Sequence, residues 1–359
     1  MSQKKTKDSA LHEKEGVLRP DSFSKKSADA AINKRKNQPT AQELSSEILK
    51  GNKTALSRAI TYIESTAQKH SKAAQEIIET CLPYSNKSIR IGITGVPGAG
   101  KSTFIESLGN LLIAKGKKVA VLAVDPSSSI SGGSILGDKT RMEELVKQEN
   151  AFIRPSASGN TLGGVARKTR ESIILCEAAG FDTIIIETVG VGQSETAVHS
   201  MTDFFLLLKI AGAGDELQGI KRGIMEMADT IVINKADGDN KKAAQKAKTE
   251  FVRALHLYPQ KESEWKPKVT LCSALQNEGI DDVWQIIEQY QKLTSKNGYF
   301  NNNRNQQNKF WLLQTIEEQL KFGFYNHQKV KAELPKQLQA IENKKVTPFE
   351  AAKILLALR

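Results

Sequence analysis

The sequence has little of what marks membrane, secreted or metal-binding proteins. Its unbroken apolar runs, such as Phe204 to Leu208, are far shorter than the ~18 residues that a membrane span needs. The N-terminus is Lys-rich, contains acids and lacks an apolar core, unlike a signal or transit peptide. Three cysteines, odd in number and widely spaced, support neither a disulfide framework nor a CxxC metal site. We therefore expect a cytoplasmic protein without a membrane partner.

The positive charge is concentrated at the two ends of the chain. The 359 residues carry a formal net charge of +12. Residues 1–40 and residues 301–359 each hold ten Lys/Arg against five Asp/Glu, which leaves 32 against 30 for residues 41–300. Because the middle of the chain is nearly neutral and carries the motifs described below, no nucleic-acid partner is predicted.

Composition and periodicity divide the chain into four parts. Residues 1–40 are polar and without apolar periodicity, which predicts a disordered basic tail. Residues 41–88 carry apolar residues at three- and four-residue steps and form a predicted helical segment. Residues 89–295 form the main domain. Residues 296–359 are interpreted as an Asn/Gln-rich linker followed by a helical arm with an apolar stripe from Trp311 to Phe324.

Six short, nearly all-apolar runs alternate with helix-length segments in the main domain. These runs are Ile91–Thr94, Val119–Val124, Thr183–Glu187, Phe204–Ile210, Thr230–Asn234 and Val269–Ser273. Such alternation predicts an α/β fold with a mostly parallel sheet that helices cover on both faces.

A phosphate-binding motif follows the first of these runs. Residues 95–103 match the full G-x-x-x-x-G-K-[ST] pattern, with a predicted strand before it and a predicted helix after it. Glycines let backbone N–H groups converge on phosphates at a helix N-terminus, while the Lys reaches the β/γ oxygens and the Ser hydroxyl binds Mg²⁺. The predicted phosphate-binding residues are Gly95, Gly98, Ala99, Gly100, Lys101, Ser102 and Thr103.

A second motif indicates which base is bound. Asn234, Lys235 and Asp237 match the N-K-x-D pattern of guanine-reading GTPases. A carboxylate can accept from both N1–H and the 2-amino group of guanine, whereas adenine would leave it unpaired. Asn234 is expected at the 6-oxo/N7 edge, and the stem of Lys235 along the ring. The third base-side element comprises Ser273, Ala274 and Leu275. The order of these motifs, each at the end of a strand, favours GTP over ATP.

Acidic residues near the P-loop form the expected metal side of the site. Glu187 ends a predicted strand, Asp125 ends another, and Asp138 follows in the next loop. We expect these carboxylates and Ser102 around Mg²⁺, although a helix cap or turn is the alternative role for the two aspartates. Val191 stands where Ras-like proteins carry a water-positioning Gln, so we predict slow intrinsic hydrolysis. The catalytic set is Lys101, Glu187 and Gln193, of which Gln193 is equally well explained as a loop polar residue.

Several long motifs resemble the MeaB/ArgK family of methylmalonyl-CoA mutase-associated GTPases. They cover residues 124–142, 154–164, 187–195 and 212–223, and the helical stretch 59–65 is also similar. The resemblance implies a P-loop GTPase with GTP/GDP and Mg²⁺ as cofactors. It further implies a chaperone that gates adenosylcobalamin loading and protects or reactivates methylmalonyl-CoA mutase or a related cobalamin-dependent mutase. Asp215, Gln218 and Lys221 would then couple the nucleotide state to the mutase.

The resemblance also implies a homodimer formed through the C-terminal arm. A helix packed back on its own domain is the alternative explanation of the stripe from Trp311 to Phe324. Two other functions are the alternatives to this chaperone role. A nickel-insertion GTPase is disfavoured because the five histidines are scattered and form no Cys/His cluster. A phosphotransferase, which older family naming as an amino-acid transport kinase suggests, lacks a recognisable acceptor site.

Overall fold

The computed structural model describes residues 39–65, 67–124, 142–155, 162–188, 194–212 and 222–358. The chain divides into a unit that ends at Thr40 and a second unit from Ala41 to Arg359. The predicted basic tail lies outside the described residues, apart from its last two positions.

A seven-stranded sheet with parallel pairing throughout forms the centre of this unit, in the order β3-β2-β4-β1-β5-β6-β7. Six strands overlap the predicted apolar runs, while the short edge strand β3 was not predicted. The fold class expected from the sequence is therefore confirmed. The strands are β1 (Ile89–Gly95), β2 (Val119–Val124), β3 (Ala151–Arg154), β4 (Thr183–Thr188), β5 (Phe204–Ile210), β6 (Thr230–Asn234) and β7 (Lys268–Leu271).

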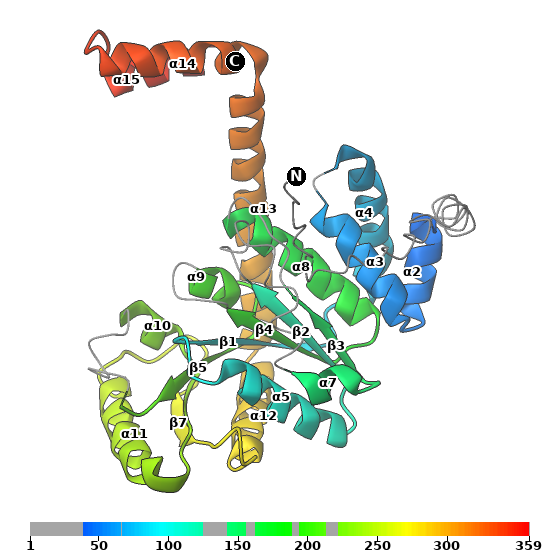
Figure 1. The fold of residues 1–359 in the computed structure, drawn as a ribbon, viewed down its shortest axis with the longest axis vertical. Helices are drawn as coiled ribbons and strands as arrows, with labels where there is room; N and C mark the ends of the chain where they lie inside the picture. The colour runs from blue at the N-terminus through cyan, green and yellow to red at the C-terminus, as the bar shows by residue number, and fades with distance from the viewer. Residues whose placement is uncertain are drawn as a thin grey trace, which may run out of the picture. The chain divides into compact units, whose positions relative to one another are not determined.

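Helices cover both faces of the sheet, which explains why the strands are apolar on both sides. In β4, Ile184 and Ile186 pack in one core cluster, whereas the intervening Ile185 packs in the cluster on the opposite face. One face carries α8 (Leu162–Ala178), α9 (Ser194–His199), α10 (Arg222–Met227) and α11 (Lys241–Leu255), and the other carries α5 (Lys101–Ala114), α7 (Glu143–Lys147) and α12 (Ile280–Lys296) (Figure 1).

Three N-terminal helices pack against α8. They are α2 (Ala41–Leu49), α3 (Lys53–Glu64) and α4 (Gln68–Cys81), followed by the 3-10 turn η1 (Leu82–Tyr84). Gly51 adopts a positive φ of 82°, and the Asn52 side chain then accepts from the backbone N–H groups of Thr54 and Ala55. This glycine-then-cap sequence ends one helix and begins the next.

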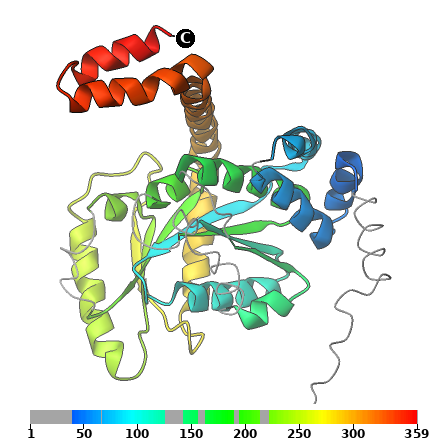
Figure 2. The ribbon, with the colours of Figure 1, turned by 45° about the horizontal axis from the view of Figure 1, so that its top comes forward.

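The C-terminal arm consists of α13 (Tyr299–Asn326), α14 (Gln328–Glu342) and α15 (Pro348–Leu356). α13 runs past the sheet and extends beyond it, and α14 and α15 lie side by side at its far end (Figures 1 and 2). The structure differs here from the sequence interpretation, because residues 299–308 of the expected linker form the first part of α13. No helix in the described parts of the chain is long and apolar enough to cross a membrane.

Buried side chains from the first half of α13 explain that difference. The Arg304 guanidinium donates to both carboxylate oxygens of Asp203, at 2.7 and 2.6 Å. Gln307 Nε2 donates to the Thr202 carbonyl at 2.7 Å, and Trp311 Nε1 donates to the Ser200 carbonyl at 3.1 Å. Burial opposes the charge of Arg304, but Asp203 raises the pKa of Arg304 above its ordinary value. Tertiary contacts of this kind make a polar segment helical when its composition alone suggests a linker.

Candidate functional site

The P-loop joins the end of β1 to the start of α5 at the carboxyl edge of the sheet. A Cβ on Gly95 would lie 2.3 Å from the Leu208 carbonyl oxygen of β5, so only glycine lets the two strands approach this closely here. Gly100 has a φ of 85°, and a Cβ there would lie 2.7 Å from Asn234 Nδ2. Two of the predicted glycines are thus required by the backbone path of the loop and by its contact with the next motif.

The first turn of α5 carries the predicted phosphate and metal side chains. Lys101 Nζ donates to the Gly95 carbonyl oxygen at 2.9 Å and so closes the loop on itself. Ser102 is partly exposed and Thr103 is exposed, whereas Ala99 in the loop is buried. The backbone N–H groups of a helix's first turn have no partner within the helix. This arrangement presents hydroxyls, N–H groups and an ammonium at one helix N-terminus, which suits an oxyanion.

Asn234, the last residue of β6, connects the P-loop to the predicted base-side loop. Its Nδ2 donates to the Ala99 carbonyl at 2.9 Å, and its Oδ1 accepts from the Ala274 N–H at 3.0 Å. The Cys272 thiol also donates to this Oδ1, at 3.4 Å. Burial, and secondarily the charge of Asp237, raises the pKa of Cys272 to about 12, which keeps the thiol protonated as a donor. Asn234 therefore holds two loops in register from a buried position.

Asp237 and Ser273 meet across the same loops. The Ser273 hydroxyl donates to Asp237 Oδ2, and the backbone of Ser273 pairs with Glu278 through two hydrogen bonds of 2.9 and 3.1 Å. Lys235 is exposed with a φ of 58°, and its carbonyl accepts from Asn240 Nδ2 at 2.7 Å, which stabilises this turn. The sequence-predicted base-side residues are thus brought together, with Ala274 buried and the side chain of Leu275 exposed.

Glu187 lies near the carboxyl end of β4, beside the strand that leads into the P-loop. It is buried, and in the parallel register it is opposite Ile93 of β1 and Ala123 of β2. The neighbouring Thr188 donates to the Thr94 hydroxyl at 3.0 Å, which joins the ends of β4 and β1. The structure thus brings one predicted metal-side carboxylate to the edge that also carries Ser102.

Six further predicted residues lie outside the described parts of the chain. They are Asp125, Asp138, Gln193, Asp215, Gln218 and Lys221. The segments that contain them follow β2, β4 and β5, of which β4 and β5 pair directly with β1.

Two contacts at this edge were not predicted from the sequence. Ser107 Oγ, on α5, donates to the Ala274 carbonyl at 2.7 Å, so the P-loop helix and the base-side loop are fastened together a second time. Cys272, just before the base-side loop, donates to Asn234 as described above. Neither residue belongs to a motif, and only the three-dimensional arrangement identifies it.

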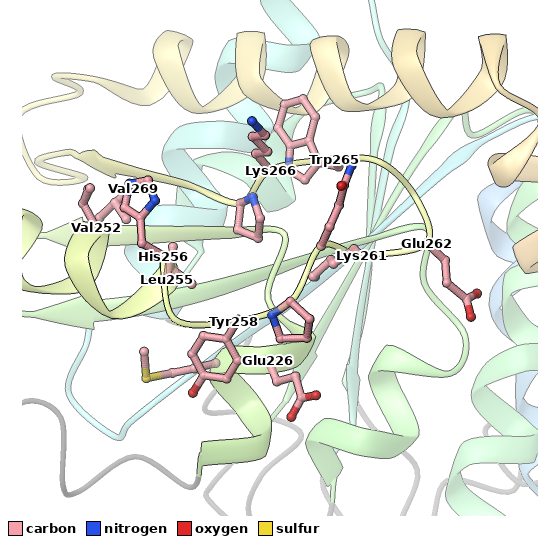
Figure 3. A pocket seen from close by; sticks show the side chains of 14 residues that line it. Glu226, Val252, Leu255, His256, Tyr258, Lys261, Glu262, Trp265, Lys266 and Val269 are labelled. Atoms are coloured by element: carbon pink, nitrogen blue, oxygen red, sulfur yellow. The ribbon is translucent and has the colours of Figure 1, made fainter.

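A cavity of about 590 Å³ lies away from these loops, beside β7 (Figure 3). Figure 3 shows side chains that include Tyr258, Lys261 and Trp265 around it. Two of its polar side chains are bonded to protein: Lys261 Nζ donates to Asp229 Oδ1 at 2.8 Å and to two backbone carbonyls, and Trp265 Nε1 donates to the Asp229 carbonyl at 2.9 Å. No predicted nucleotide-site residue lines this cavity, so the loops at the carboxyl edge remain the candidate site.

A parallel sheet that carries a P-loop after its central strand β1, with the N-K-x-D element after β6, two strands along the sheet, defines the class of P-loop GTPases. The model of the family "Methylmalonyl Co-A mutase-associated GTPase MeaB" matches residues 56–329. This chain belongs to that family and is a GTPase.

Named relatives agree with this assignment. The chain is 45% identical over 312 residues to "GTPase ArgK" of Escherichia coli (strain K12), which covers 87% of this chain and 94% of the relative. It is 43% identical over 331 residues to "Methylmalonic aciduria type A homolog, mitochondrial" of Mus musculus, with 89% and 80% covered. The crystal structure titled "LAO/AO transport system kinase" matches with a TM-score of 0.72 and 38% identity, over 90% of this chain and 98% of that one.

Proposed function

We propose that this GTPase binds GTP and GDP through the three loops at the carboxyl edge of the sheet. The residues from Gly95 to Thr103 would hold the phosphates, and Asp237 would accept from guanine N1–H and its 2-amino group. The sequence analysis expected Asn234 at the 6-oxo/N7 edge of the base. In the structure, its amide nitrogen and its amide oxygen are both hydrogen-bonded to protein. We therefore assign Asn234 as a positioning residue that keeps phosphate and base loops at a fixed separation. Lys235 would pack its stem along the base, and the Ser273–Leu275 loop would offer a backbone N–H to the guanine oxygen.

The oxygen donors at the edge fit a hard divalent cation. Ser102 and Glu187 would hold Mg²⁺ together with Asp125 and Asp138, and the ion would neutralise charge on the β- and γ-phosphates. Lys101 would stabilise the same oxygens during hydrolysis. Val191 supplies no group to orient the attacking water, so intrinsic turnover is slow unless a partner contributes, with Gln193 as the residue of this chain offered for that role.

The cellular function that fits best is that of a chaperone for methylmalonyl-CoA mutase or a related cobalamin-dependent mutase. GTP binding and hydrolysis would gate adenosylcobalamin loading and protect or restore the mutase, with Asp215, Gln218 and Lys221 transmitting the nucleotide state. The observation that carries this proposal is the match of residues 56–329 to the mutase-associated family. A reducing cytoplasm fits the three cysteines, which are free and buried.

GTP turnover by the purified chain, measured with and without purified methylmalonyl-CoA mutase, tests this proposal. ATP is the control for the base. We expect a slow, GTP-only rate that rises clearly when the mutase is added. A GTP-only rate that the mutase leaves unchanged would contradict this partner, and equal turnover of ATP would contradict the base-side assignment.

We also propose that the arm forms a homodimer, on the basis of the apolar surface that it exposes. Beyond Trp311, the side chains of Leu312, Leu313 and Phe322 are 62%, 62% and 67% exposed, and Ile316 and Leu320 are also exposed. Scattered exposed apolar residues are ordinary, but a series along one projecting helix is typical of an interface. The two explanations of the apolar stripe therefore apply to different parts of α13. The first part packs on its own domain, and the exposed later part would form the dimer contact.

Sedimentation velocity tests the dimer. Leu313→Glu combined with Leu320→Glu should convert a dimer into a monomer, because each change buries a charge in an apolar contact. Lys309→Glu and Lys321→Glu, polar positions on the same helix, are the matched control. A wild-type chain that sediments as a monomer, or a Leu313/Leu320 variant that remains dimeric, would refute this interface.

A further inference from the structure

A second cavity, of about 250 Å³, is lined by residues of α8 and of the first part of α13, at the end of the sheet away from the P-loop. The charged residues of its lining are three arginines and one glutamate, Glu171. The groups that matter here are Arg90, Arg167, Arg170, Asn86, Asn308 and Trp311. The nucleotide function above does not use any of them.

Arg170 is the unusual member of this group. Its Nη2 donates to Asn308 Oδ1 at 3.0 Å, and its guanidinium carbon lies 4.6 Å from the centroid of the Trp311 ring. Within the described segments, no carboxylate lies at ion-pair distance from it. Burial, together with the charge of Arg90, holds the pKa of Arg170 well below its ordinary value. A half-buried guanidinium balanced only by an amide oxygen and a ring face is costly without an anion.

The neighbouring charges do not compensate Arg170. Arg90 is engaged by Glu177, with Nε–Oε1 at 3.0 Å, and Arg167 lies 3.6 Å from Glu171 on its own helix. α13 and η1 contribute only uncharged residues to the cavity lining. Three guanidinium groups therefore face two carboxylates, which leaves one positive charge in excess.

Hydrogen-bond donors are also in excess around the cavity. Arg90 donates from Nε and Nη2, and Arg170 donates from Nη2; in the described residues neither has a partner on Nη1. Asn308 uses its Oδ1 to accept from Arg170, which leaves its amide N–H groups as further donors. An oxyanion supplies both the missing charge and the missing acceptors, and guanidinium pairs bind carboxylate and phosphate groups strongly.

We propose that this cavity is a binding site for a small oxyanion, held by Arg170 with Arg90 and the Asn308 amide. The occupant carries a phosphate, sulfate or carboxylate group. Bound there, it connects residues of β1 and α8 to the first part of α13 and so strengthens the attachment of the C-terminal arm to the sheet domain. The site is separate from the P-loop and does not depend on the proposed partner.

Thermal unfolding of the full chain in saturating GDP and Mg²⁺ tests this site. Sulfate, phosphate and acetate are each compared with chloride at equal ionic strength. We expect a bound oxyanion to raise the midpoint by about 3 °C at tens of millimolar. Arg170→Gln should lose this increment, whereas Arg58→Gln, which removes an exposed charge from α3, should keep it. Because general salt effects and binding at the P-loop are common to all three proteins, an increment of equal size in Arg170→Gln refutes the site.

Asn308→Asp provides a second test that does not require removing the arginine. The new carboxylate would lie beside Arg170 and act as a built-in anion. We expect a higher midpoint in chloride and loss of the oxyanion increment. A variant that still gains the wild-type increment would contradict the proposal. The order among sulfate, phosphate and acetate identifies whether a tetrahedral or a planar oxyanion fits.

Discussion

The two edges of the sheet are built from different interactions. At the carboxyl edge, neutral hydrogen bonds from Asn234, Ser107 and Thr188 fasten the loops together. At the amino edge, ion pairs do so: Arg90 with Glu177 and Arg304 with Asp203 are buried, and Lys261 with Asp229 is partly buried. The carboxyl edge carries the loops of the proposed nucleotide site, whereas the ion pairs at the amino edge hold helices α8 and α13 against the sheet. The edges therefore separate nucleotide binding from the attachment of helices, and substitutions at each should change different quantities.

Lys101→Ala should give the largest effect, confined to the carboxyl edge. We expect GTP turnover to fall about 10³-fold, because the ammonium that stabilises charge on the transferred phosphoryl group is lost. The free energy of unfolding should change little. Steady-state phosphate release measures turnover, and Lys118→Ala, an exposed lysine, is the control. Undiminished turnover would overturn the P-loop assignment.

Arg304→Met should give the opposite pattern at the amino edge. Removing one partner of a buried ion pair leaves Asp203 uncompensated, which costs about 3 kcal/mol in the free energy of unfolding. GDP affinity of the folded fraction should be unchanged. Urea unfolding measures the first quantity and a GDP titration the second. Lys336→Met, which breaks an exposed pair with Glu333, should cost less than about 0.5 kcal/mol. Equal costs for the two variants would contradict the contrast between the edges.

Asp237→Asn sharpens the comparison by changing specificity without changing stability. Xanthine carries a 2-oxo group in place of the 2-amino group, and an amide can donate to it. We expect the preference for guanine over xanthine nucleotides to fall roughly 100-fold, consistent with two hydrogen bonds lost and remade. Competition between GDP and XDP measures the ratio. Asp239→Asn, two residues further along, should leave it unchanged. A variant that still prefers guanine as strongly as the wild type would show that Asp237 does not read the base.

Ser107→Ala should give the smallest effect. Loss of its hydrogen bond to the Ala274 carbonyl removes about 1 kcal/mol of loop positioning, so GDP should bind about fivefold more weakly. Ser200→Ala removes a bond of the same type and length, to the Ala197 carbonyl, from the region of the amino edge. That variant should leave GDP affinity unchanged, and a similar loss in both would indicate a general rather than a local effect.

Sequence reasoning found the parts of the fold that local patterns determine. The apolar runs located six strands, and the motifs located the P-loop and the N-K-x-D element. The strand β3 was not predicted because it has only four residues, too few for a periodic signal in the sequence. The start of α13 was interpreted as a linker because the residues that stabilise Arg304 and Gln307 lie about a hundred positions away in the sequence. The bracing role of Asn234 also depends on two loops distant in sequence, which no pattern of neighbouring residues can reveal.

The central position of β1 has a consequence for biosynthesis. This strand is made first, yet its partners begin at Thr183 and Phe204. At synthesis rates of about 5–20 residues per second, a buried apolar strand waits several seconds or longer on the ribosome before either neighbour emerges. The N-terminal helices cannot complete their core in the meantime, since α8 has not yet been made. We therefore expect the nascent chain to be aggregation-prone until about residue 210 has left the exit tunnel.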